Sequence, residues 1–211
     1  MKPKKNPLKF SFLIMSSLPP LTLNYSNQLA SITFNRPEKR NAFSSDMLRL
    51  LSDALDELEQ KNDHSVLVLR GSNGHFCSGW DFNEFEEMTE KGLEHLENTF
   101  LEHLSILNRL EAHSKLVISI VEGSVMGFGF SLMARSDITL CASNSHFAFP
   151  ELDIGIVPSI VMIDVHRFVN PKTALEWVTS GRQISAEEVA QVGLVSKLIP
   201  PSSSFNEVVD T

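Results

Sequence analysis

The sequence predicts an α/β fold built around a mostly parallel sheet. Short apolar runs of strand length alternate along the chain with longer stretches of helical period. Several of the apolar runs are uninterrupted, which is typical of strands that are buried on both faces. At 211 residues, of which 42% are hydrophobic, the chain has the size and composition of one globular domain with a sizeable core.

Strands are predicted from two kinds of pattern. Residues 28–34 alternate apolar and polar side chains up to the turn signal Asn35-Arg36-Pro37. In contrast, Val66-Leu67-Val68-Leu69 is a continuous apolar run that ends in the glycine-containing loop 71–74. Continuous runs recur further along the chain. The predicted strands are residues 28–34, 66–69, 116–121, 137–142, 146–149 and 194–199.

Helices are predicted between these strands. Apolar residues recur every three or four positions from Met47 to Leu58, and Ser44 or Ser45 precedes them as a candidate N-cap. A glutamate-rich region reaches to about residue 113, and its charge and its histidines (95, 103 and 113) are expected to lie on a solvated surface. The predicted helices are residues 45–61, the polar region up to 113, and residues 131–135, 173–180 and 186–191.

The composition excludes several classes of protein. The net charge is −8, so nucleic acid is not expected as the main partner, because phosphate binding needs a surplus of Lys and Arg. The two cysteines, Cys77 and Cys141, are too few for a disulfide framework or a cysteine-built zinc site, and they favour a reducing compartment. The seven histidines have no metal-ligand spacing, and no metal site is predicted. No apolar run approaches the roughly 18 to 20 residues that a membrane span needs.

The N-terminus differs in composition from the remainder of the chain. Residues 1–15 carry four lysines and no acidic residue, and a short apolar run from Phe10 to Met15 closes the segment. An export signal would have a longer apolar core and a small-residue cleavage site. We therefore expect a disordered leader over 1–15, with Met15 as a second candidate start, and one domain over 16–211.

Two loops each follow a buried strand and open a helix. They are residues 75–82, around Gly79, and residues 123–129, around Gly127. Free backbone N–H groups at such helix starts can receive a negatively charged oxygen, and two that converge would form an oxyanion hole. Each loop considered alone is better explained by glycines that only serve tight turns. A third segment, residues 149–158, places Glu151 in an apolar turn, where burial would raise its pKa toward general acid–base use.

Together these segments resemble the crotonase, or enoyl-CoA hydratase/isomerase, family. They occur in the order found in that family and span roughly residues 20 to 200. The matching segments are NRPEKRNAF (35–43), FCSGWDF (76–82), VEGSVMGFGFSLMARSDI (121–138), FPE (149–151) and ISAEEVAQVGLV (184–195). The resemblance implies a crotonase-like spiral of β-β-α units with mostly parallel sheets, and an acyl-CoA thioester as substrate. Because coenzyme A is part of that substrate, no cofactor is implied.

The resemblance also assigns site residues by position. The oxyanion donors would be the backbone N–H groups of Trp80 and Phe128, and Glu151 would move the proton. The positions implied in substrate binding are Lys39, Arg40, Ala42, Ser78, Gly79, Asp81, Gly127 and Ser131. Lys39 and Arg40 would meet phosphates of the nucleotide.

Several departures from the family pattern bear on the reaction. Hydratases of the family carry two glutamates, but the first of these positions is Ser131 in this chain, which favours an enoyl-CoA isomerase with the single carboxylate Glu151. Ser131 as the holder of a water leaves hydration open, and Asp153 is a lesser candidate acid. Phe128 stands where glycine is common, and the Trp80 ring would narrow the acyl pocket.

The C-terminus is a further departure. The sequence ends at Thr211, where the family continues into helices that close the acyl site and help to build a trimer. The sequence therefore predicts a weakened or altered trimer-based oligomer. It also leaves open an alternative: a catalytically silent homologue that serves as an acyl-CoA-binding or interaction module. The expected location is the cytoplasm, or mitochondria or peroxisomes in a eukaryote.

Overall fold

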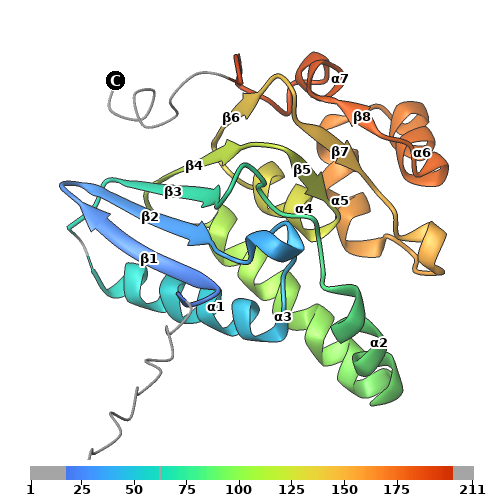
Figure 1. Cartoon of the computed structure of the whole chain (residues 1–211), viewed down its shortest axis with the longest axis horizontal. Helices are drawn as coiled ribbons and strands as arrows, with labels where there is room; N and C mark the ends of the chain where they lie inside the picture. Colours follow the sequence, from blue (N-terminus) through green and yellow to red (C-terminus); the bar gives the residue numbers. More distant parts are fainter. Residues whose placement is uncertain (1–17, 62, 202–211) are drawn as a thin grey trace, which may run out of the picture.

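A six-stranded sheet forms the centre of the protein in the computed structural model, which describes residues 18–61 and 63–201 (Figure 1). The strand order is β1-β2-β3-β4-β6-β9. The strands are β1 (Leu21–Ser26), β2 (Leu29–Phe34), β3 (Val66–Gly71), β4 (Leu116–Val121), β6 (Ile138–Ala142) and β9 (Lys197–Ile199). All neighbouring pairs are parallel except the β1–β2 hairpin, so the predicted fold class is confirmed. The predicted leader, residues 1–15, lies outside the described residues.

A second, smaller sheet carries the loops that follow the central strands. Its order is β5-β7-β8, with β5 (Ser124–Met126) parallel to β7 (His146–Ala148) and β7 antiparallel to β8 (Ile184–Ser185). Because β5 follows β4 in the chain, the smaller sheet begins at the carboxyl end of a central strand. It therefore lies where ligands bind in open α/β folds.

Helices pack on the sheets and on one another. In Figure 1, α1 and α3 run side by side beneath the central sheet, and α5 and α6 lie near the smaller sheet. They are α1 (Ser45–Gln60), α2 (Phe82–Glu90), α3 (Leu93–Glu111), α4 (Phe128–Ala134), α5 (Ser159–Phe168), α6 (Pro171–Ser180) and α7 (Ala186–Gln191), with 3₁₀ turns at Pro37–Lys39 and Leu152–Ile154. Within the described residues, no helix combines the length and apolarity needed to cross a membrane.

Local sequence signals explain most of these boundaries. The Ser44 hydroxyl accepts from the N–H of Met47 at 3.2 Å, which makes Ser44 the N-cap of α1. The polar region up to residue 113 is two helices, because Gly92 adopts a positive φ of 98° between α2 and α3. Helix α4 begins three residues before the predicted start at Ser131, so the second glycine loop is itself the first turn of a helix.

Four strands and helices escaped the sequence analysis: β1, β5, β8 and α5. The α5 sequence is rich in β-branched residues, which lower helix propensity, and it is held as a helix by packing against α4 and α6. Val161 and Val165 on its inner face belong to the main hydrophobic core. Strand β8 has only two residues, too short for a periodic signal.

Backbone pairing joins the loop after β3 to the loop after β4. The N–H of Phe76 donates to the carbonyl of Glu122 at 2.8 Å, and the N–H of Cys77 donates to Ser124 at 3.2 Å. The N–H of Met126 returns a bond to the Cys77 carbonyl at 3.0 Å. The two glycine loops singled out in the sequence are therefore adjacent strands of backbone in space.

A buried asparagine fixes a third loop, residues 36–43, to the first of these two. The side chain of Asn41 accepts from the Arg36 N–H at 2.9 Å and donates to the carbonyls of Ser72 and His75 at 3.0 and 2.6 Å. Asn41 is fully buried and adopts a positive φ of 56°, a conformation that asparagine tolerates better than most residues. One side chain thus satisfies backbone groups of two loops.

Replacing Asn41 tests this connection. Asn41→Ala removes the partner of the Arg36 N–H and of the His75 carbonyl, and one of the two donors to the Ser72 carbonyl, so we expect a loss of about 2 to 4 kcal/mol in the free energy of unfolding by urea denaturation. Asn27→Ala is a matched control, since Asn27 has nearly the same φ of 52° but is exposed. That control should lose no more than about 1 kcal/mol. Equal losses in the two variants would show that the hydrogen bonds of Asn41 contribute nothing beyond its backbone conformation.

Candidate active site

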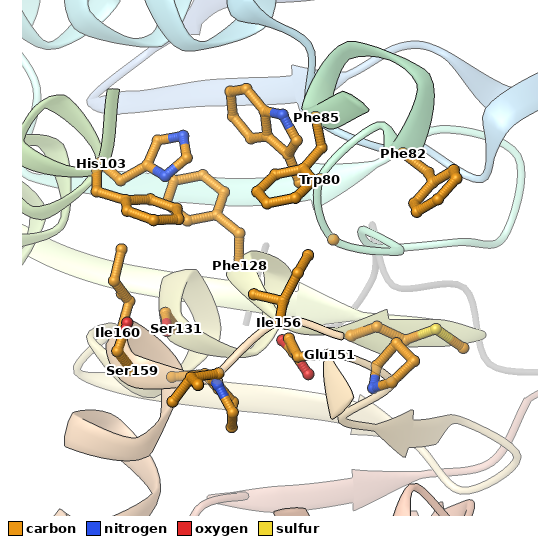
Figure 2. Close-up of a pocket in the computed structure, with 18 of the residues that line it drawn as sticks. Trp80, Phe82, Phe85, His103, Phe128, Ser131, Glu151, Ile156, Ser159 and Ile160 are labelled. Atoms are coloured by element: carbon orange, nitrogen blue, oxygen red, sulfur yellow. The ribbon is translucent and has the colours of Figure 1, made fainter. Parts of the chain in front are cut away.

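A cavity of about 140 Å³ lies beside the paired loops (Figure 2). Residues from the first glycine loop, α2 and α3, together with the Phe128 ring, form one side of it, and Ser131 of α4, the turn after β7 and the start of α5 form the other. Most of the lining is apolar or aromatic, and the polar side chains are few. Such a cavity has the character of a small-molecule site.

The two glycine loops meet at the cavity through Gly79 and Gly127. Both have positive φ, 94° and 45°, in which side chains with a Cβ are strained. A Cβ at Gly79 would lie 3.2 Å from the carbonyl oxygen of Met126, so the loops approach each other closely. The residues that follow, Trp80 and Phe128, both line the cavity.

The backbone N–H groups of these two residues are not used by the fold. The neighbouring hydrogen bonds run from Phe43 to the Gly79 carbonyl and from Asp81 to the Phe43 carbonyl, and both bypass the N–H of Trp80. Phe128 is the first residue of α4, where an N–H has no partner within the helix. Among the described residues, neither N–H has a protein acceptor.

Glu151 lies on the cavity wall beside the second glycine loop. A Cβ on Gly127 would be 2.6 Å from its Oε1, and its Oε2 is buried without a hydrogen-bond partner. Burial raises the pKa of the Glu151 carboxyl above its usual value of 4.5, and a backbone hydrogen bond lowers it in part. Of the described residues that line the cavity, Glu151 is the one with an acidic side chain.

Asp153, the lesser candidate acid, lies elsewhere. Its side chain is exposed, and its Oδ2 would be 2.9 Å from a Cβ on Gly181, at the end of α6. It is not among the residues that line the cavity. Within the described part of the chain, no group of three or more His, Cys, Asp or Glu residues is arranged to hold a metal ion.

Ser131 lines the cavity from α4, across from the aromatic wall (Figure 2). Its hydroxyl is buried and has no partner. Behind it is the buried carboxylate of Asp164 on α5, whose Oδ1 accepts from Arg135 Nε at 2.9 Å while Oδ2 has no partner. Burial raises the pKa of Asp164, and the nearby Ser131 hydroxyl and Arg135 guanidinium lower it in part. The sequence analysis did not identify Asp164.

Aromatic rings form the wall opposite Ser131 and Glu151, and one of them corrects a prediction. His103 was expected on a solvated helix surface, but only 5% of it is exposed, and it lines the cavity. Its ring centroid is 4.3 Å from that of Trp80 and 4.8 Å from that of Phe128. Burial lowers the pKa of His103 to about 4, so the imidazole is neutral at neutral pH.

Lys39 and Arg40 lie outside the cavity on an exposed loop that is tied to the first glycine loop. The Ser78 hydroxyl donates to the Lys39 carbonyl at 3.1 Å, and the Ser78 N–H donates to the Arg40 carbonyl at 3.1 Å. Ser78 itself lines the cavity. The backbone of the exposed basic pair is therefore held next to the first glycine loop by two hydrogen bonds from Ser78.

Ala42 and Asp81, two of the predicted substrate-binding positions, lie outside the cavity lining. Ala42 is buried, and its carbonyl accepts from Arg36 at 2.7 Å. Asp81 forms an ion pair with Arg36 at 2.8 Å and caps α2 by accepting from the N–H of Asn83 at 3.2 Å. Neither residue lines the cavity. Both positions stabilise the loops around the cavity.

Comparison with known proteins places this chain in a family of enzymes. Residues 24–210 match the family model described as enoyl-CoA hydratase/isomerase. The chain belongs to the enoyl-CoA hydratase/isomerase family, and the resemblance to crotonases is confirmed.

Curated relatives include both hydratases and isomerases. A short-chain-enoyl-CoA hydratase of Clostridium acetobutylicum is 30% identical over 186 residues, which cover 87% of this chain and 70% of that protein. A 2,3-dehydroadipyl-CoA hydratase of Escherichia coli is 32% identical and covers 85% and 69%. A peroxisomal Δ(3,5)-Δ(2,4)-dienoyl-CoA isomerase of Arabidopsis thaliana is 28% identical and covers 89% and 71%.

Solved structures agree with these relatives. An enoyl-CoA hydratase/isomerase from Marinobacter aquaeolei superposes with a TM-score of 0.84 at 28% identity, over 90% of this chain and 74% of that one. Human enoyl-CoA hydratase domain-containing protein 3 gives a TM-score of 0.84 at 29% identity, over 90% and 75%. The crotonase fold is therefore shown for the described domain.

The raised pKa of Glu151 predicts a pH-dependent stability. Its carboxylate is disfavoured in the folded state, so stability is lost as pH rises from the ordinary glutamate pKa of 4.5 through the higher folded pKa. Glu151→Gln removes this titration. We expect the variant to match the wild type in free energy of unfolding near about pH 4 and to exceed it near about pH 8.

A charge control belongs with this measurement. Asp153→Asn removes a carboxylate from the same turn, but the side chain is exposed, so its effect should stay within about 0.5 kcal/mol. A stability difference between Glu151→Gln and wild type that does not vary with pH would contradict the assigned cause.

Proposed function

We propose that the cavity is an acyl-CoA site in which a thioester enolate is stabilised and one glutamate moves a proton. The observation that carries the proposal is the position of Glu151, whose carboxylate lies against Gly127, next to the free N–H of Phe128. An acid–base group and an anion-binding group are thus neighbours. This is the arrangement that proton abstraction next to a carbonyl needs.

The thioester oxygen would accept from the N–H groups of Trp80 and Phe128. Both groups lack a protein acceptor and belong to cavity-lining residues of loops that are hydrogen-bonded to each other. Donors that are fixed before the reaction stabilise developing negative charge without having to reorganise. Removing a single donor of this kind typically costs about 10²- to 10³-fold in turnover.

Of the two reactions named in the family, we propose isomerisation as the main one. In a 3-enoyl-CoA, the Glu151 carboxylate would take a proton from C2, and the electron pair would pass to the thioester oxygen. The protonated Glu151 would return the proton to C4, leaving the double bond between C2 and C3. One carboxylate suffices for this exchange, and Glu151 is the acidic residue on the described cavity wall.

Hydration is the second candidate, and Ser131 with Asp164 favours it. The Ser131 hydroxyl is buried without a partner on the side of the cavity that carries Glu151, and Asp164 Oδ2, which lies outside the cavity lining, is also buried without a partner. A hydroxyl backed by a carboxylate is able to orient a water. The products distinguish the two reactions, because hydration of a 2-enoyl-CoA gives a 3-hydroxyacyl-CoA and isomerisation adds no water.

The nucleotide part of coenzyme A would lie along the exposed loop of Lys39 and Arg40. Two histidines lie near this loop: burial lowers the pKa of His146, and the nearby His75 and Arg40 lower it further, so the His146 imidazole offers a hydrogen bond rather than a positive charge. These electrostatic contacts place the basic groups of Arg40, His75 and His146 in one neighbourhood. A phosphate would find several cationic or hydrogen-bonding groups there.

The oligomeric state and the cellular location are proposed from the family. A trimer-based homo-oligomer stays a prediction from the family resemblance. Relatives carry the names of a peroxisomal enzyme in Arabidopsis thaliana and a mitochondrial protein in Homo sapiens. Those compartments, or the cytoplasm in a bacterium, are the proposed locations.

Binding of acetoacetyl-CoA tests the oxyanion site. Its enolate resembles the proposed intermediate, so calorimetry should show tighter binding than for free CoA, by about tenfold or more, because charge-assisted hydrogen bonds are the stronger ones. Butanoyl-CoA, which has no stabilised enolate, is the control for simple filling of the cavity. Equal affinities for acetoacetyl-CoA and butanoyl-CoA would argue against an oxyanion site formed by the N–H groups of Trp80 and Phe128.

Replacing Glu151 tests the proton transfer. Glu151→Gln is nearly isosteric, so the variant should fold and bind acyl-CoA, while exchange of solvent deuterium into the α-carbon falls by about 10²- to 10⁴-fold. Asp153→Asn, in the same turn but outside the cavity, should exchange at a rate close to that of the wild type. Undiminished exchange in Glu151→Gln would remove Glu151 from the mechanism.

A further inference from the structure

A second hollow adjoins the cavity beside α2 and α3. It measures about 520 Å³ and is open to solvent. The two spaces share part of their lining, which comes from α2, α3 and the turn before α5. The shared residues are Phe82, Phe85, Phe100, Ile156, Val157 and Ser159. The residues that line the second hollow alone are Glu86, Thr89, Leu96 and Gly155.

The second hollow lies beyond the groups proposed for the reaction. Among the described residues, Trp80, Phe128 and Glu151 line the cavity and not the second hollow. The same is true of Ser78, which holds the loop of Lys39 in place. A thioester bound between Trp80 and Phe128, with its nucleotide along that loop, would leave the second hollow to the far end of the acyl chain.

Apolar side chains at the second hollow are left in contact with water. Phe82 on α2 is 46% exposed, and Val157 in the turn before α5 is 74% exposed. In Figure 2, Phe82 and Phe85 lie on one side of the cavity and Ile156 on the other. Exposed apolar groups that are gathered at a groove are typical of binding sites. An apolar ligand that covers them removes their surface from water, which is favourable.

We propose that the acyl chain of the substrate runs from the cavity into the second hollow, so that the site takes medium- and long-chain acyl-CoA thioesters. This inference rests on the proposed acyl-CoA function. The reaction end of the chain lies in the cavity, and the methylene groups further along lie between α2, α3 and the turn before α5.

The lining suits an uncharged tail. Neither Lys nor Arg is among the described residues that line the cavity or the second hollow, so a carboxylate at the far end of the chain would have no counter-ion. It would also meet the like charge of Glu86, which lines the second hollow. Methylene groups, in contrast, gain contacts with the rings of Phe85 and Phe100.

A series of saturated probes separates binding of the tail from turnover. We would measure the affinities of butanoyl-, hexanoyl-, octanoyl- and decanoyl-CoA by calorimetry, below the concentrations at which the longer probes form micelles. Each methylene group that enters the second hollow should tighten binding by about two- to fourfold. Decanoyl-CoA should therefore bind the wild type at least about 15-fold more tightly than hexanoyl-CoA.

Thr89→Trp connects this preference to the second hollow. The new ring would fill the hollow from α2, at a position that does not line the cavity, so the ratio of decanoyl-CoA to hexanoyl-CoA affinity should fall at least about fivefold. Thr179→Trp on α6 is the matched control. Both threonines are exposed, and each hydroxyl donates to a backbone carbonyl of its own helix at 2.7 Å. The control should leave the ratio unchanged.

A second variant acts from the other helix and covers the case in which Thr89→Trp does not fold. Leu96→Asn replaces apolar surface of α3 in the second hollow by an amide, so it should also lower the ratio. Leu175→Asn, at an exposed leucine of α6, is its control. Because each ratio is taken within one protein, a general loss of affinity cancels.

Three results would overturn the assignment while leaving acyl-CoA binding intact. One is an affinity that stops rising beyond hexanoyl-CoA, and another is a ratio that neither variant changes. The third is a second copy of the chain as the occupant of the second hollow: the wild type would then sediment as a dimer, and Thr89→Trp would dissociate it without changing the ratio. Failure of every acyl-CoA to bind better than free CoA would overturn the proposed function as well.

Discussion

The site depends on a short backbone pairing between residues 76–77 and 122–126. Its three hydrogen bonds, of 2.8 to 3.2 Å, join the ends of two parallel strands and bring Gly79 and Gly127 to one cavity. The pairing requires small residues on both sides: a Cβ on Gly129 would be 2.5 Å from the carbonyl oxygen of Cys77. The close approach of backbone to backbone is thus the constraint that positions two free N–H groups, and the surrounding loops act to hold it.

Polar groups gathered at the cavity are stabilised poorly by the protein itself. Trp80, His103, Ser131 and Glu151 each keep a buried polar atom without a hydrogen bond, on walls that are otherwise apolar. In a folded protein such atoms are rare, because each is desolvated without compensation. Such a concentration at one cavity, together with the raised pKa of Glu151, is typical of functional sites.

The proposed anion site and the proposed acid–base groups come from different elements of the fold. The N–H groups belong to loops fixed by backbone pairing, whereas the side chains at 131 and 151 are carried by α4 and by the turn after β7. A change of side chain at one of these positions leaves the anion site in place. Ser131 lines the cavity with a buried hydroxyl, and the buried carboxylate of Asp164 on α5 lies nearby.

The sequence by itself determined the parallel α/β class, most strands, an N-cap at Ser44 or Ser45, and the loops around Gly79 and Gly127, because periodicity, capping and turn glycines are local properties. It also singled out Glu151 by its apolar turn. Only the tertiary structure decided that His103 is buried rather than solvated. The local pattern around it is polar, and the rings that cover it come from loops distant in the sequence. Helix α5 and the ion pair of Asp81 with Arg36 were decided in the same way, since long-range packing and charge pairing leave no periodic trace in the chain.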